Sequence, residues 1–346
     1  MAIKSLDFRR YRSDDAQERQ QFCDELCEAL CVYGFAKIRH SSLPKEKIDQ
    51  LFEFNKRFFD LPDDIKVKAA HPAAPNPHRG WSAIGQESVW QISKFEQGEQ
   101  QTDSYQEYRV CPPPGSRHIA NSPLFQESFD QGAATDELFP NRWVDETDLP
   151  GFRPFMEGIY DDFHELHGHL VRAITAGLRL PADHLIAKHQ SNTSELRLLH
   201  YPAIPARSMG SGKRIGEHSD FGTLTLLLQD SVGGLQVEDQ RQLGSFIPVE
   251  SENVYEVIIN VGDCLQRWTN KQLRSANHRV CLPQGTDVHS TAMLAPRYSV
   301  AYFGKPDREV LVDTLPAFVR PGIKSAYNDH LTALEYMQQK LVRTYG

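Results

Sequence analysis

The region after residue 190 constrains the fold most strongly, because short apolar runs alternate there with turn-forming residues. The runs are rich in Leu, Val, Ile and Tyr, and they are separated by Gly, Pro, Asn and Asp; examples are "ELRLLHYP", "GTLTLLLQ", "VYEVIINVGD" and "RYSVAYF". Many short strands at this spacing are typical of a β-sandwich or barrel, whereas a parallel α/β sheet would need a helix between successive strands. We therefore expect a β core.

Helical patterns flank this core. Apolar residues at helical spacing predict helices over 14–33, over "PKEKIDQLFEFNKRFFDLP", over 151–179 and over 322–343. Proline and glycine make residues 71–115 rich in loops. The expected fold class is mainly β with flanking helices. We divide the chain into an N-terminal module of helices and edge strands (1–115), a connecting segment with the long helix (116–190), the β core (191–310) and a C-terminal helical segment (311–346).

The composition limits the kinds of molecule that the protein is expected to bind. Of the 346 residues, 40% are hydrophobic and 24% are charged, which is ordinary for a globular protein. The formal net charge is −8, and no basic stripe appears that would bind nucleic acid or an anionic membrane. No apolar run is long enough to span a bilayer. We expect a cytoplasmic protein with a small-molecule substrate and without nucleic acid or membrane as partner, and the sequence leaves its oligomeric state open.

A histidine and an aspartate in "GEHSDFGTLTLL" suggest a metal site. His218 and Asp220 are two residues apart, and side chains on an extended chain alternate between faces, so both can reach one ion. A third ligand should come from another strand, and His278, at the start of the strand in "LRSANHRV", meets that requirement. Two histidines and one carboxylate form the facial triad of non-haem Fe(II) oxygenases, which leaves coordination positions open for substrate or oxygen.

The last predicted strand adds a receptor for a carboxylate. In "RYSVAYF", Arg297 and Ser299 share one face by the same alternation. A guanidinium is a planar fork that can bond both oxygens of a carboxylate, and the serine hydroxyl adds another donor. Tyr201, in "LLHYP", could offer a third. A carboxylate held near a ferrous ion is what a 2-oxo acid cosubstrate requires.

The ordered set of HxD, a distal histidine and RxS resembles the iron(II)/2-oxoglutarate-dependent oxygenases, in their isopenicillin-N-synthase-like branch. Further segments are similar to that branch across nearly the whole chain: "CVYGFAKIRHSSLP", "FFDLPDDIK", "RGWSAIGQE", "ESFD" and "INVGDCLQRWTNKQLRSANHRV". The resemblance implies a double-stranded β-helix (jelly-roll) core.

The same resemblance assigns roles to the site residues. It gives His218, Asp220 and His278 to Fe(II), and it gives Arg297, Ser299 and Tyr201 to the distal carboxylate of 2-oxoglutarate. With O2 as second cosubstrate, such an enzyme oxidises an unactivated C–H bond of a small molecule, for instance a natural product, and releases succinate and CO2. One position departs from the pattern: many plant relatives read N-x-Y at the strand of Tyr201, where this chain has Leu199.

The substrate is not identified by any motif. Arg197 alternates with Leu199 and Tyr201, so it should face the interior, where it could bind an acidic or phenolic substrate or form a structural salt bridge. Trp268 and Phe303 are candidate walls of the substrate pocket by the same alternation. Aromatic core packing is the alternative role for each of them.

Two other clusters resemble metal sites but lack the right spacing. "HELHGHL" places Gly168 where the zincin motif needs its second histidine, so we predict a solvated helix face for His164, His167 and His169. Cys23, Cys27 and Cys31 lie four apart without a CxxC spacing, which favours small apolar side chains on a packed helix.

Three other functions stay open at this stage. An iron oxygenase or oxidase of the same fold could use no 2-oxo acid, because such enzymes retain residues like RxS. A zinc-dependent hydrolase would also suit two histidines and a carboxylate, and it would need a general base near the metal. A non-catalytic binding protein is the third, although neither the triad nor RxS is needed to fold a jelly roll.

Overall fold

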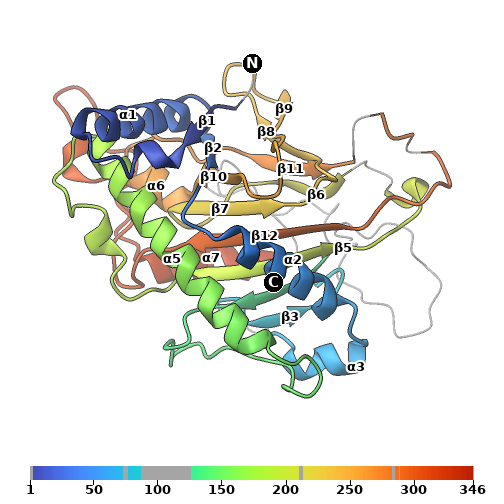
Figure 1. Cartoon of the computed structure of the whole chain (residues 1–346). Helices are drawn as coiled ribbons and strands as arrows, with labels where there is room; N and C mark the ends of the chain where they lie inside the picture. Colours follow the sequence, from blue (N-terminus) through green and yellow to red (C-terminus); the bar gives the residue numbers. More distant parts are fainter. Residues whose placement is uncertain are drawn as a thin grey trace.

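Two β-sheets form the centre of the molecule (Figure 1). The computed structural model describes residues 3–72, 77–86, 126–209, 213–282, 285–287 and 289–345. In these residues every strand pairing is antiparallel except that of β1 with β2. The larger sheet has the order β1-β2-β10-β7-β12-β5-β4-β3 and the smaller one the order β6-β11-β8-β9. This is the predicted jelly roll.

The strands are short, as the sequence predicts. In the larger sheet they are β1 (Ser5–Asp7), β2 (Phe35–Arg39), β10 (Val257–Val261), β7 (Leu224–Gln229), β12 (Arg297–Gly304), β5 (Glu195–Tyr201), β4 (Glu127–Gln131) and β3 (Gly80–Ser82). In the smaller sheet they are β6 (Lys213–His218), β11 (His278–Cys281), β8 (Leu235–Glu238) and β9 (Phe246–Pro248).

Helices cover one face of the larger sheet. The long helix α5 (Phe152–Gly177) runs across that face in Figure 1, beside α1 (Ala16–Tyr33) and α2 (Lys45–Phe59). Helix α1 starts where the Asp15 carboxylate accepts hydrogen bonds from two backbone N–H groups, and it ends at Gly34 in the left-handed conformation. Cys23 and Cys27 are buried on α1, as expected of small packing residues. Among the described residues, the other α-helices are α3 (Asp63–Lys66), α6 (Asp263–Trp268) and α7 (Ala333–Tyr345).

Successive side chains on the central strands point to opposite faces of the larger sheet, and the two faces lie in different environments. On β12, Val300 and Tyr302 point outward into the main core beneath the helices, where Phe58, Phe129 and Phe163 also lie. The intervening side chains point to the other face, between the two sheets. Arg297, Ser299, Ala301 and Phe303 of β12 and Glu195, Arg197, Leu199 and Tyr201 of β5 all line one cavity there. The strand period predicted from the sequence thus places a row of polar side chains inside the jelly roll.

One helix prediction was wrong in part, and one helix was missed. Helix α7 begins at Ala333, not near residue 322, because Thr332 and Glu335 form a capping box in which each side chain bonds the other's backbone N–H. Helix α6 was not predicted, since its six residues directly follow the apolar strand β10. Most of the predicted loop region 71–115 lies outside the described residues.

In the part of the chain that the structure describes, no helix has both the length and the apolar character that a membrane span requires.

Candidate active site

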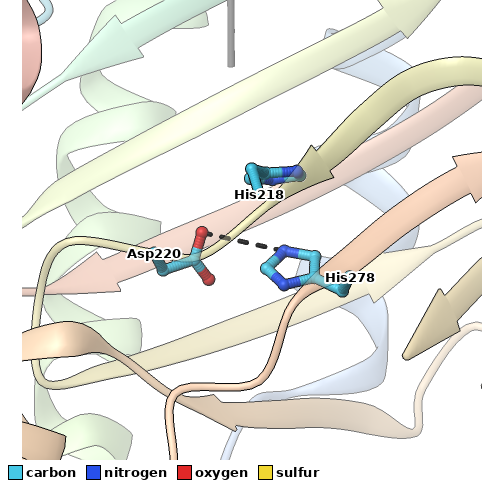
Figure 2. Close-up of side chains that lie close together, drawn as sticks. All are labelled: His218, Asp220 and His278. Carbon is cyan, nitrogen blue, oxygen red and sulfur yellow. Dashed lines mark ion pairs between the residues drawn. The ribbon is translucent and has the colours of Figure 1, made fainter. Parts of the chain in front are cut away.

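The three predicted metal ligands lie close together where strand β6 of the smaller sheet ends and strand β11 begins. His218 ends β6, Asp220 follows in the next turn, and His278 begins β11 directly opposite His218 in the antiparallel register. The ligand atoms of the three residues lie within 4.8 Å of one another, and 3.8 Å separate His278 Nε2 from Asp220 Oδ1. Figure 2 shows the three side chains close together, with the carboxylate of Asp220 facing the ring of His278. Among the described residues, no other group of His, Cys, Asp and Glu side chains converges in this way.

Both imidazoles are oriented by backbone carbonyl groups. His218 Nδ1 lies 2.9 Å from the carbonyl oxygen of Gly216, and His278 Nδ1 lies 3.2 Å from that of Ala276. A carbonyl can only accept, so Nδ1 is the donor in both rings, and this contact favours the neutral tautomer in which Nε2 keeps its lone pair for a metal. Burial, and then the neighbouring His278, lower the pKa of His218 to about 4. His218 is therefore the neutral ligand that a metal requires at neutral pH.

Asp220 is held by two donors that the sequence did not reveal. Its Oδ2 accepts hydrogen bonds from Thr225 Oγ1 at 2.7 Å and from Asn260 Nδ2 at 2.6 Å, and Oδ1 is the oxygen nearer His278. Burial acts to raise the pKa of Asp220, but the two histidines and these hydrogen bonds outweigh it and lower the pKa. The carboxylate thus offers one oxygen to a metal while the other is fixed by the protein. This donor set fits Fe(II).

Removing one of these supports is expected to weaken metal binding. Thr225→Val keeps the volume of the side chain but deletes the hydrogen bond to Asp220, and losses of such outer contacts typically reduce metal affinity about 10–100-fold. Anaerobic titration with Fe(II) measures the change. Thr175→Val is the matched control, because the Thr175 hydroxyl is also buried but bonds a carbonyl within α5. Equal affinities in Thr225→Val and the wild type would contradict this role.

A buried guanidinium lies in the same cavity. Arg297 is only 1% exposed, and its three nitrogens donate to the carbonyl of Gly233 (2.9 Å), to Ser299 Oγ (3.0 Å) and to Gln229 Oε1 (2.9 Å). Its guanidinium carbon lies 5.0 Å from the ring centre of Tyr201. All these partners are neutral, and no carboxylate of the described residues lies within ion-pair distance. A buried cation of this kind suits an anionic ligand.

The walls beside Arg297 are apolar. Leu199, at the position of the Asn in plant relatives, packs with Tyr201 and Ala301 and offers no polar atom to a ligand. The smaller sheet closes the cavity from the opposite side with apolar side chains, which are Ile215, Leu235 and Val280.

The other end of the cavity is charged. Arg197 of β5 is paired with Ala301 of β12. This pair lies four residues along the strands from the pair of Tyr201 and Arg297, so roughly 13 Å separate the two pairs. Arg197 Nε donates to the buried carboxylate of Asp130 at 2.6 Å, and its guanidinium carbon lies 5.9 Å from the ring centre of Phe303. Arg197 therefore forms a salt bridge and also lines the cavity.

Glu195 and Lys305 line this end as well. Glu195 Oε1 accepts from Arg79 Nη1 at 3.1 Å, and Oε2 pairs with Lys305. Burial opposes ionisation, but the charges of Lys305 and Arg79 outweigh it and lower the pKa of Glu195 to about 2. Apart from Asp220, Glu195 is the one carboxylate among the described cavity residues. Its low pKa makes it a weak base and both of its oxygens are paired with cations, so it is poorly suited to be the general base of a zinc hydrolase, and that alternative is not favoured.

Two predictions need correction. Trp268 does not line the cavity: it lies on α6, where strand alternation does not apply, and its buried indole donates to the carbonyl of Leu311 at 3.0 Å. The predicted solvated face of "HELHGHL" is also wrong, because His167 is 1% exposed and faces Gly304. His164 is half-buried, with its Nδ1 3.0 Å from the hydroxyl of Tyr302.

Comparison with known proteins agrees with this geometry. Residues 192–306 match the model of the 2OG-Fe(II) oxygenase superfamily, and residues 3–146 match that of the N-terminal region of the non-haem dioxygenases in morphine synthesis. The 2-oxoglutarate-dependent dioxygenase htyE of Aspergillus rugulosus is 65% identical over the full length of both chains. The proline hydroxylase buaE of Petromyces alliaceus is 45% identical, also over the full length of both.

A solved structure extends the likeness to three dimensions. A full-length Neurospora crassa protein, crystallised in complex with alpha-KG and thymine, superposes with a TM-score of 0.83 at 29% identity, covering 98% of this chain and 96% of that one. Its bound alpha-KG shows that this fold accommodates the cosubstrate predicted here. On the agreement of sequence, fold and site, this chain belongs to the 2-oxoglutarate- and Fe(II)-dependent oxygenase superfamily.

Proposed function

We propose that this protein binds Fe(II) through His218, Asp220 and His278 and holds the distal carboxylate of 2-oxoglutarate at Arg297, Ser299 and Tyr201. We further propose that it oxidises a C–H bond of a small carboxylic acid whose carboxylate lies near Arg197. The observation that carries the first part is the buried guanidinium of Arg297, which has only neutral partners and opens into the cavity of the triad.

The bound iron and 2-oxoglutarate supply the oxidising chemistry, in which decarboxylation of 2-oxoglutarate to succinate and CO2 is coupled to oxidation of the substrate. The chain itself contributes geometry. His218 and His278 present fixed Nε2 atoms, and Thr225 and Asn260 keep one oxygen of Asp220 directed at the metal. The apolar walls exclude water, which strengthens the attraction between Arg297 and a carboxylate.

The substrate proposal rests on the charges at the Arg197 end. Arg197 and Lys305 both line this end of the cavity, where Asp130 holds the guanidinium of Arg197 through its Nε and Glu195 pairs with Lys305. The ring of Phe303 adds an apolar surface beside it. A small amino or imino acid offers a carboxylate and an aliphatic body to these two groups. The name of the relative buaE, a proline hydroxylase, is compatible with that chemistry and makes L-proline the first substrate to test.

The test of the proposed function is an assay of anaerobically purified protein with Fe(II), O2, 2-oxoglutarate and L-proline, in which succinate and hydroxylated product are both measured. We expect succinate and product in equal amounts, and no product without 2-oxoglutarate. L-Prolinamide, which lacks the carboxylate, should be a poor substrate, since a site built for a charged group rejects the analogue without it. Product formed at an unchanged rate without any 2-oxo acid would favour the cosubstrate-free oxygenase instead.

Arg197→Met is expected to reduce coupled product formation while 2-oxoglutarate is still converted to succinate. The reason is that Arg197 lies about four residues along the strands from Arg297, so its loss should spare the cosubstrate. The same change removes the cation that pairs with the buried carboxylate of Asp130. Loss of one partner from a buried ion pair lowers the free energy of unfolding by about 3–5 kcal/mol. The ratio of product to succinate and the melting temperature are measured together.

A double variant separates the two effects. Asp130→Asn combined with Arg197→Met removes the buried charge, so part of the stability should return while the coupling stays low. If the double variant recovers normal coupling as well as stability, Arg197 supports the barrel and does not bind the substrate.

A further inference from the structure

A single aspartate connects the metal-binding turn to helix α7. Asp263, the first residue of α6, is fully buried, and its backbone N–H donates to the carbonyl of the metal ligand Asp220 at 2.8 Å. Its side chain accepts a hydrogen bond from Ser275 Oγ at 2.7 Å, three residues before His278. The other carboxylate oxygen lies 3.5 Å from the hydroxyl of Ser219, which is the residue between the metal ligands His218 and Asp220.

Helix α7 reaches this aspartate with two side chains. Lys340 Nζ lies 2.9 Å from Asp263 Oδ2, and the hydroxyl of Tyr336 donates to the same oxygen at 3.1 Å. Lys340 is 1% exposed, so this is a fully buried ion pair. Its ammonium also lies 5.5 Å from the ring centre of Phe221, which follows Asp220 and lines the cavity. Removing either charge would leave the other uncompensated in the protein interior.

The residues that directly follow Tyr336 and Lys340 on the same helix form part of the cavity wall. Met337 and Leu341 of α7 line the cavity, and Lys305 Nζ lies 3.2 Å from Met337 Sδ. Met337 thus contacts the charged end that contains Glu195 and Arg197, whereas the cosubstrate residues Arg297 and Tyr201 lie on β12 and β5 at the other end. Helix α7 also contacts the core through a small apolar group around Tyr336 and through backbone hydrogen bonds from Ala333 to Val310 and from Leu334 to Arg308.

We propose that Lys340 is a positioning residue for substrate oxidation: through its ion pair with Asp263, it holds Met337 and Leu341 of α7 as the wall that closes the substrate end of the cavity. This inference rests on the proposed function, because its test measures the hydroxylated product and the succinate that the proposed reaction forms. Because Asp263 also bonds the backbone of Asp220, the position of this wall is fixed relative to the metal ligands. A substrate held against the wall is then held at a fixed place relative to the metal, and bulk water is excluded from that side.

The main test compares Lys340→Met with the wild type in the Fe(II)-loaded full-length protein. We expect α7 to exchange its backbone amide hydrogens faster, and the ratio of hydroxylated product to succinate to fall at least several-fold. The affinity for 2-oxoglutarate, measured anaerobically from the visible absorption of its Fe(II) complex, should stay within about twofold. Lys340→Arg keeps the charge and should restore much of the coupling. Faster exchange in α7 with unchanged coupling would overturn the inference.

Two controls exclude a general loss of stability. Leu26→Ala opens a cavity in the distant core between α1 and α5 and should lower the melting temperature without changing the coupling. Gln339→Met alters the exposed neighbour of Lys340 on the same helix and should leave both quantities unchanged. If Leu26→Ala lowers the coupling as much as Lys340→Met, the effect is one of stability and the proposal fails.

A third variant tests the wall without breaking the ion pair. Met337→Ala should lower the coupling while leaving hydrogen exchange in α7 near the wild-type rate, and unchanged coupling would show that Met337 is not part of the wall. Failure of the proposed function has a different signature, because the wild-type protein itself would then make no hydroxylated product, with or without succinate from 2-oxoglutarate.

Discussion

Replacing His218, Asp220 or His278 by alanine is expected to reduce both iron binding and turnover below detection while leaving the fold intact. The three side chains provide the whole ligand set at this site, and two remaining ligands cannot hold the metal in the same geometry. The fold should survive, because these polar residues lie on the cavity side, away from the main core beneath the helices. Asp220→Ala also leaves the donors of Thr225 and Asn260 without their shared acceptor.

Metal analysis of anaerobically purified protein measures the first effect. A second measurement does not depend on turnover: Fe(II) at about 100 times its dissociation constant should stabilise the wild type by about 2.7 kcal/mol and should not stabilise the variants. His330→Ala is the matched control, since His330 also lies beside an aspartate, 2.6 Å from Asp313, but is largely exposed. A wild-type protein that holds zinc and turns over without iron would contradict the assignment.

The residues whose position in the cavity lining the sequence predicts correctly are those governed by strand alternation. Arg297, Ser299, Arg197 and Phe303 all line the cavity, because β12 and β5 are regular strands whose inner faces carry every second residue. Trp268 fails for the same physical reason. The chain leaves β10 at Gly262, where a Cβ would lie 2.3 Å from the carbonyl oxygen of Gly222, and it turns there into α6, so the period of two no longer applies.

The supporting residues could not be predicted, because they depend on the register between distant strands. Asn260 is paired with Thr225 across β10 and β7, and this pairing directs both side chains at Asp220. Asp130 is likewise paired with Arg197 across β4 and β5. Neither pairing can be deduced from one sequence, in which the partners are tens of residues apart. The division of the chain at residues 115, 190 and 310 stays a prediction.

The second large effect is expected for the cosubstrate. Arg297→Ala should raise the dissociation constant of 2-oxoglutarate steeply, because the distal carboxylate would be desolvated in the cavity without its buried cation, at a cost of about 2–5 kcal/mol. That corresponds to roughly 30-fold to several thousand-fold weaker binding. Ser299→Ala removes one hydrogen bond to a charged group and should cost about 1–2 kcal/mol. Anaerobic titration of the Fe(II) protein with 2-oxoglutarate measures both.

A matched ligand identifies which carboxylate Arg297 holds. 2-Oxopentanoate keeps the 2-oxo acid group that chelates a metal but lacks the distal carboxylate. The wild type should strongly prefer 2-oxoglutarate, and in Arg297→Ala the two acids should bind with similar affinity, because the lost interaction is specific to the distal carboxylate. A second buried guanidinium, that of Arg214, lies 5.7 Å from the ring centre of Tyr201. If Arg297→Ala still prefers the dicarboxylate strongly, Arg297 is not the anchor and Arg214 is the cation to replace next.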